Sequence, residues 1–149
     1  MARWRRSPYD GRSYVADASA WTRAHHASVL DDWSSALRND QIATCAIVMF
    51  ELLYSARDGE EYDRLAEDLG QLHDVPISRS VASAALGAMR ALAHVRPFYH
   101  RGIKLPDLLI AAAAQDVGMG VLHYDAHYDR LAEVLEFESR WIAPPGTLD

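Results

Sequence analysis

Cysteine is nearly absent from this chain of 149 residues, in which Cys45 is the only one. A single cysteine excludes an internal disulfide, and a thiolate metal cluster needs more sulfur ligands than one. The neighbours of Cys45 are apolar, so we expect a buried and unreactive thiol. This cysteine usage fits a reducing compartment, and we expect a cytoplasmic protein.

Long apolar runs are also missing. The longest, residues 108–114, is far shorter than the roughly 20 residues that cross a bilayer as a helix. Arg3, Arg5 and Arg6 stand near the N-terminus, but no apolar segment of signal-peptide length follows them. We therefore expect no membrane partner.

Positive charge is in short supply, with 15 Lys and Arg against 21 Asp and Glu and a formal net charge of -6. This balance excludes a broadly basic nucleic-acid-binding surface. It does not exclude a metal-dependent nuclease, because bound cations change the local sign of the charge. What the chain does have is 50% apolar and 24% charged residues, the composition of one globular domain with a sizeable core.

Strands and helices are predicted to alternate along the chain. This order indicates an α/β fold, a single domain with a central, mainly parallel sheet flanked by helices. A connector is expected at 73–77 and a loop at 97–102. The predicted strands are 13–18, 41–44, 121–124 and 137–142, and the predicted helices are 21–39, 46–57, 62–72, 78–95, 105–116 and 128–135.

The domain is expected to span residues 13–143. Residues 1–12 are polar and are expected to form a loose N-terminal segment. Pro144 and Pro145 stop the last predicted strand, so 144–149 is expected to be a C-terminal tail.

Four acidic residues, far apart in the sequence, each lie within or at the end of an apolar run: Asp17, Glu51, Asp107 and Asp125. A carboxylate in such surroundings loses hydration and needs compensation. Asp17 and Asp125 lie toward the ends of predicted strands, where the functional groups of parallel sheets gather. Asp107 opens a predicted helix, and Glu51 lies one to two turns into another. We therefore expect all four to line one edge of the sheet.

Clustered carboxylates repel one another, and without a cation at least one pKa in the cluster rises. A divalent ion stabilises the ionised set, and hard oxygen ligands suit Mg²⁺ or Mn²⁺. Such an ion activates water and stabilises the charge that develops in phosphodiester cleavage. The pattern thus predicts a metal-dependent hydrolase.

Each acid taken singly has a simpler interpretation. Asp17 is also compatible with a helix cap, and Glu51 with the solvent face of an amphipathic helix. Asp107 fits an acid in the first turn of a helix, and Asp125 fits a turn. The metal-site interpretation depends on the joint pattern, because all four occur at corresponding places in the α/β alternation.

At these residues the chain resembles the PIN-domain ribonucleases, and within them the VapC toxins of prokaryotic toxin–antitoxin pairs. The resemblance covers nearly the whole chain. Its motifs are VADAS at 15–19, FELL at 50–53, LPDLLIAA at 105–112 and VLHYDAHYDRLA at 121–132. The third motif is the most specific match.

The resemblance implies a PIN-like fold, Mg²⁺- or Mn²⁺-dependent endoribonuclease activity on RNA, a homodimer, and inhibition by a cognate VapB-like antitoxin. It also assigns Asp17, Glu51, Asp107 and Asp125 as the catalytic metal-site acids. Ser19 becomes a hydrogen-bonding support for the site.

The fourth motif departs from the family pattern in two places. His123 stands where many relatives have Thr, and His127 stands where many have a second Asp. These changes put the arrangement of a second metal in question. We expect Asp129, one turn further on, to substitute in part for the missing acid, and His127 is a second candidate support.

Arg96, Arg101 and Lys104 belong to a basic cluster in an otherwise acidic chain. Because it precedes Asp107, we expect it to bind RNA phosphates, although a solvated face is an equally simple interpretation. The histidines show no zinc-ligand motif. Two other functions stay open, a phosphoacceptor receiver-like domain and a non-catalytic interaction module with the PIN fold.

Overall fold

The computed structural model describes residues 7–148 of the chain. Its strands form one five-stranded sheet in the order β3-β2-β1-β4-β5, and all neighbouring pairs are parallel. The expected α/β domain with a central parallel sheet is therefore confirmed. The strands are β1 (Tyr14–Ala16), β2 (Ile42–Cys45), β3 (His73–Val75), β4 (Gly120–His123) and β5 (Ser139–Trp141).

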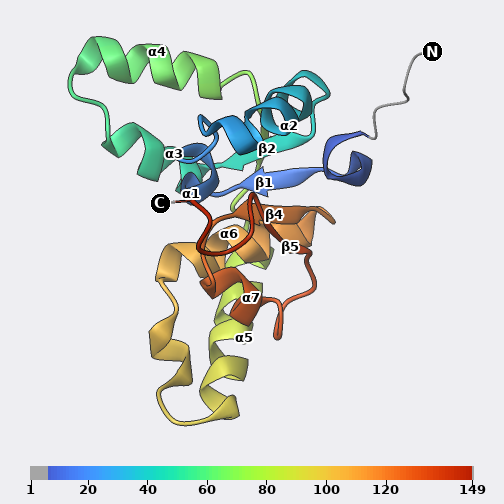
Figure 1. Ribbon diagram of the computed structural model, residues 1–149. Coiled ribbons are helices and arrows are strands. Elements are labelled where there is room, and N and C mark those ends of the chain that lie inside the picture. Colours follow the sequence, from blue (N-terminus) through green and yellow to red (C-terminus); the bar gives the residue numbers. More distant parts are fainter. Residues whose placement is uncertain (1–6, 149) are drawn as a thin grey trace.

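Helices cover the sheet on both faces. In Figure 1, α2 lies above the strands and α5 and α7 lie below them, while α1 and α3 lie to their left and α4 extends to the upper left. The helices are α1 (Ala18–Trp21), α2 (Ala27–Arg38), α3 (Ala46–Tyr54), α4 (Gly59–Leu69), α5 (Arg79–Val95), α6 (Leu105–Asp116) and α7 (His127–Leu131), with short 3₁₀ helices η1 (Pro8–Gly11) and η2 (Tyr99–Gly102).

The strands divide the core into two parts, because successive strand residues point to opposite faces of a sheet. Val15 and Val121 are fully buried among residues of α5 and α6. Their neighbours Tyr14, Ala16 and Leu122 are fully buried against residues of α1 and α2. With both faces covered, the three central strands β1, β2 and β4 are buried at every residue, as is usual for parallel sheets.

The strand order reverses direction between β1 and β4. In open parallel sheets, ligands bind outside the carboxyl ends of the strands at such a switch point. Asp17 comes directly after β1, and Asp125 comes two residues after the end of β4. The order also differs from the 2-1-3-4-5 arrangement of receiver-type sheets, so the receiver-like alternative is not favoured.

The predicted helix 21–39 is wrong in its first part, because α1 ends at Trp21 and α2 begins only at Ala27. The rings of Trp21 and Trp33 pack edge to face with their centroids 4.7 Å apart. In one continuous helix, residues 12 positions apart would be separated by about 18 Å. The turn between α1 and α2 allows this packing. The contact between the two rings therefore outweighs the apolar spacing that predicted one continuous helix.

The connector predicted at 73–77 is also wrong, because it contains strand β3. Only Val75 of this strand is buried, while His73 and Asp74 are exposed, so the segment shows no apolar pattern. Pairing with β2 makes it a strand. Likewise, the loop predicted at 97–102 contains η2, and the helix predicted from residue 62 begins at Gly59.

The N-terminal segment predicted to be loose, 1–12, lies partly outside the described residues, which begin at Ser7. The side-chain amide of Gln41 donates to the carbonyl oxygens of Pro8 (2.8 Å) and Arg12 (2.9 Å). These bonds tie η1 to the start of β2.

The C-terminal tail, predicted at 144–149, is tied down as well. The Leu148 amide donates to the Tyr124 hydroxyl at 2.8 Å, and this hydroxyl donates back to the Leu148 carbonyl at 2.7 Å. Asp149 lies outside the described residues. The boundaries 13–143 remain a prediction. Between residues 7 and 148, no helix is long and apolar enough to span a bilayer.

Candidate metal centre

The four predicted acids come together at the carboxyl edge of the sheet, carried by four different elements. Asp17 caps α1 directly after β1, Glu51 lies on α3, Asp107 lies in the first turn of α6, and Asp125 follows β4. Asp17, Glu51 and Asp107 offer ligand atoms that all lie within 4.8 Å of one another. A second such group consists of Asp107, Asp125 and His127, so Asp107 belongs to both.

Asp17 is held by hydrogen bonds to both carboxylate oxygens. Its Oδ2 accepts from the Ser19 hydroxyl (2.6 Å) and the Ser19 amide (3.0 Å). The Ser19 hydroxyl in turn accepts from the amide of Tyr124 at 2.9 Å. This chain of bonds joins the ends of β1 and β4, and it fixes Asp17 before any ligand arrives.

Tyr128 supplies the remaining bond to Asp17 and was not among the predicted site residues. Its fully buried hydroxyl lies 2.7 Å from Oδ1 of Asp17 and 3.2 Å from Oδ1 of Asp107. Burial, followed by the charges of the two acids, raises the pKa of Tyr128 well above its ordinary value. The hydroxyl therefore stays a donor. In the sequence, the one sign of this role is that Tyr128 stands three residues after Asp125. A tyrosine that only packs in the core would fit that position equally well.

Asp107 is buried to the same extent as Asp17, with only 4% of its surface exposed. Burial raises the pKa of Asp107, and the nearby Asp17 carboxylate raises it further, while the hydrogen bond from His127 opposes the shift. The pKa of Glu51 is raised by burial and then by Asp17 and Asp107, and Lys104 opposes this. The site is thus a cluster of like charges that a cation would stabilise.

Asp125 is positioned by two histidines. Its amide donates to Nδ1 of His123 at 3.1 Å, and its Oδ1 accepts from the amide of His127 at 3.0 Å. His123 is fully buried, and burial lowers its pKa to about 4. The imidazole is therefore neutral at pH 7, and its Nε2 lies 2.7 Å from the hydroxyl of Ser139.

Asp129 does not join the cluster. Its two carboxylate oxygens accept from the Ser139 hydroxyl (2.7 Å) and from the indole nitrogen of Trp141 (2.9 Å), both on β5. Instead, His127 approaches the acids, with its Nδ1 3.1 Å from Oδ2 of Asp107 and 3.6 Å from Oδ1 of Asp125. The structure thus gives the place expected for a second acid to His127.

The predicted RNA-binding residues lie at different distances from the acids. Lys104 precedes α6, close enough for its charge to act on Glu51. Arg96 precedes η2 and Arg101 lies within it, and their guanidinium groups lie over the rings of Tyr99 (4.2 Å) and Phe98 (5.1 Å), respectively. Figure 1 shows that α5 and η2 extend below the sheet, away from its carboxyl edge.

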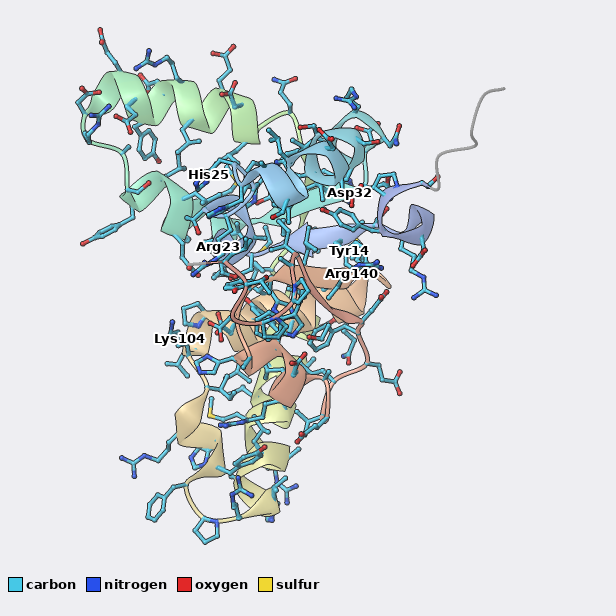
Figure 2. All side chains as sticks on the ribbon, in the orientation of Figure 1. Tyr14, Arg23, His25, Asp32, Lys104 and Arg140 are labelled. Atoms are coloured by element: carbon cyan, nitrogen blue, oxygen red, sulfur yellow. The ribbon has the colours of Figure 1, made fainter. Side chains whose placement is uncertain are left out.

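Arg23 is a further cation near the site that the sequence did not single out. It donates to the carbonyl of Ser19 at 3.1 Å and lies 4.5 Å from the centre of the Tyr124 ring. In Figure 2, Arg23 and Lys104 lie to the left, on the side of the strands' carboxyl ends, while Tyr14 and Arg140 lie to the right. Two cations therefore accompany the acids at this edge.

Comparisons with known proteins agree with this geometry. The PIN domain family matches residues 14–134, the segment that contains all four acids. Ribonuclease VapC18 of Mycobacterium tuberculosis is 42% identical over 135 residues, which cover 91% of this chain and 98% of that one. Ribonuclease VapC51 of the same organism is 37% identical over 136 residues, covering 91% and 97%.

Solved structures share the fold at lower identity. The VapBC-5 toxin–antitoxin structure from Mycobacterium tuberculosis has a TM-score of 0.62 and 22% identity, covering 87% of this chain and 98% of that one. The DNA-bound VapBC structure from Salmonella typhimurium has a TM-score of 0.65 and 14% identity, covering 89% and 99%. By family match and by identity over nearly its whole length, this chain belongs to the PIN-domain family, among the VapC ribonucleases.

Proposed function

We propose that this protein is a metal-dependent endoribonuclease toxin that cleaves RNA phosphodiester bonds with metal-activated water. One observation carries the proposal: four acids from four separate elements converge at the switch point of a parallel sheet. Such convergence is costly without a cation, because burial and like charge already raise the pKa of Asp107. The names of the VapC relatives supply the substrate class.

The donor set fits Mg²⁺ or Mn²⁺. Asp17, Glu51 and Asp107 offer carboxylate oxygens close enough to share one ion, and Asp125 extends the set through Asp107. When bound, the ion would lower the pKa of a coordinated water and neutralise charge on the phosphate. We assign these four acids as the catalytic residues.

The other residues of the site position the acids and the RNA. Ser19 and Tyr128 orient Asp17, so that its carboxylate is preorganised. We assign Lys104 to the binding of an RNA phosphate beside the acids, and Arg96 and Arg101 to phosphates further along the strand. Because the chain is acidic overall, these local cations carry the attraction for RNA.

The partner that we propose is a VapB-like antitoxin. The solved neighbours are toxin–antitoxin complexes by their names. Phe50 and Tyr54 expose 70% and 93% of their surfaces on α3, the helix of Glu51, and Tyr62 exposes 46% on α4. An amphipathic antitoxin helix would cover such side chains. We also propose a homodimer, and light scattering of the protein with and without antitoxin would test both assemblies.

Cleavage of RNA by the purified protein tests the function. We expect divalent-dependent cleavage that a chelator abolishes and added Mg²⁺ or Mn²⁺ restores. Asp17→Asn and Asp107→Asn should each lower the rate by at least about 100-fold, because each removes a charged ligand. Asp31→Asn, at an exposed acid of α2, is the matched control and should keep the full rate. Full activity in both site variants, or in the presence of chelator, would refute the proposal.

A phosphodonor experiment separates the receiver-like alternative. Incubation with a small phosphodonor should leave Asp17 unmodified if the protein is a nuclease. A stable aspartyl phosphate on this residue would support the alternative instead. The non-catalytic alternative predicts metal binding without any cleavage in the same assay.

A further inference from the structure

We propose that His127 is a ligand of the bound metal through Nδ1, which makes this a mixed nitrogen and oxygen site. The inference rests on the proposed function and extends it to the choice of ion. A site of carboxylates alone suits Mg²⁺, whereas an imidazole nitrogen favours first-row transition ions such as Mn²⁺ and Co²⁺. The protein should therefore prefer these ions over Mg²⁺ more strongly than a site with a carboxylate at position 127.

The distances between the donor atoms fit one ion. Nδ1 of His127 lies 3.1 Å from Oδ2 of Asp107 and 3.6 Å from Oδ1 of Asp125. Neighbouring ligand atoms of an octahedral ion with bonds of 2.1 Å are about 3.0 Å apart. A cation in this position would replace the hydrogen bond that now joins the imidazole to Asp107.

The position of the imidazole is built into the backbone. The amide of His127 donates to Oδ1 of Asp125 at 3.0 Å, at the start of α7. This bond holds the histidine on the same side as Asp125. The His127 side chain is 26% exposed, so an ion and its water ligands can reach the ring. The site is accessible and already formed.

Between residues 7 and 148, no further carboxylate joins His127 beside Asp107 and Asp125. Asp129, the nearest candidate, has both oxygens bonded to Ser139 and Trp141 on β5. His123, the other histidine beside Asp125, has Nδ1 occupied by the Asp125 amide and Nε2 close to Ser139. Within the described residues around the cluster, His127 alone presents a ring nitrogen to the acids.

Electron spin echo spectroscopy of the protein loaded with Mn²⁺ tests the coordination directly. We expect ¹⁴N modulation from a directly bound imidazole in the wild type. The modulation should be lost in His127→Asp and retained in His123→Asn. Bound Mn²⁺ without ¹⁴N modulation, or modulation that survives in His127→Asp, would overturn the inference and leave the proposed function standing.

Calorimetric titration with Mn²⁺, Co²⁺ and Mg²⁺ tests the choice of ion. We expect His127→Asp to lower the ratio of Mn²⁺ to Mg²⁺ affinity by about tenfold, with a larger change for Co²⁺. An unchanged ratio would show that His127 only donates a hydrogen bond to Asp107. Failure of the wild type to bind any divalent ion would count against the proposed function itself, which separates the two failures.

Discussion

At the scale of single residues, the Tyr128 hydroxyl stabilises two acids that are otherwise deprived of water. It is fully buried and lies within hydrogen-bonding distance of both Asp17 and Asp107. Because the hydroxyl has one proton, it cannot donate a full hydrogen bond to both carboxylates at once. Tyr128 therefore compensates for part of the electrostatic cost of the site in the absence of metal.

We predict that Tyr128→Phe lowers the free energy of unfolding of the metal-free protein by about 1.5–3 kcal/mol, the usual range for hydrogen bonds to charged groups. The loss should be smaller with saturating metal, because a cation then neutralises the acids. Urea unfolding with chelator and with Mn²⁺ measures both values. Tyr54→Phe, at a side chain that is 93% exposed, is the control and should change neither. An equal loss in both conditions would contradict this role.

His123 gives the protein a stability that depends on pH. Burial lowers its pKa to about 4, below the ordinary value of 6.5. Between these two values the unfolded state binds a proton that the folded state excludes. The contribution is therefore present above pH 6.5 and is lost as the pH falls toward 4, and its full size is about 3 kcal/mol.

The difference in unfolding free energy between the wild type and His123→Asn measures this contribution. Asparagine cannot titrate but still offers an acceptor to the Asp125 amide. We predict that the difference grows in favour of the wild type as the pH rises from 4 to 6.5 and is constant above it. The titration of the carboxylates affects the unfolding free energy of both proteins equally, so it cancels in the difference. A difference independent of pH would show that His123 is not buried in its neutral form.

At the scale of elements, β1 and β4 position the site because they lie side by side without any space between them. Gly120 at the start of β4 is paired with Tyr14 of β1. A Cβ atom on Gly120 would lie 2.6 Å from the Tyr14 ring and 2.7 Å from the carbonyl of Glu138. The Tyr14 ring cannot swing away, because its hydroxyl is bonded to Glu138 and Arg140.

We predict that Gly120→Ala lowers the free energy of unfolding by about 1–3 kcal/mol through overpacking. Gly87→Ala is the matched control, because Gly87 lies inside α5 with nothing within 4 Å of an added Cβ. That change should raise stability by about 0.5–1 kcal/mol. Thermal unfolding of both variants decides the matter. A Gly120→Ala variant as stable as the wild type would mean that β1 and β4 separate easily.

At the scale of the whole molecule, folding assembles a cluster of like charges that the sheet and its helices hold together. The pKa of Asp107 is raised by burial and by Asp17. Its charged form is therefore unfavourable in the folded state. The stability that this group contributes at low pH is lost as the pH rises through its folded pKa. At pH 7 the metal-free protein is destabilised by the same acids that we propose as metal ligands.

We predict that Asp107→Asn unfolds at least as high in urea as the wild type at pH 7 without metal. Added Mn²⁺ should stabilise the wild type by about 2.7 kcal/mol at a hundredfold excess over its dissociation constant, and the variant far less. Unfolding with and without Mn²⁺ measures both effects. A metal-free variant that is clearly less stable would mean that Asp107 supports the fold rather than the site.

The sequence by itself determined the α/β alternation and the identity of the four acids. These features depend on apolar spacing and on residue types within short segments, so they can be recognised without knowing the fold. The family resemblance implied Ser19 as a support of the site, and its hydroxyl bonds to Asp17, two positions away in the chain. Local patterns were sufficient wherever a helix, strand or hydrogen bond depends on residues that are close in the sequence.

Only the tertiary structure decided which groups meet. The bond from Tyr128 to Asp17 joins residues 111 positions apart, and no local pattern predicts it. The choice of His127 over Asp129 depended on β5, which binds both oxygens of Asp129. Strand β3 likewise exists because β2 pairs with it. Each outcome depends on contacts between distant segments, because burial and hydrogen bonding there outweigh the preferences of any single stretch of chain.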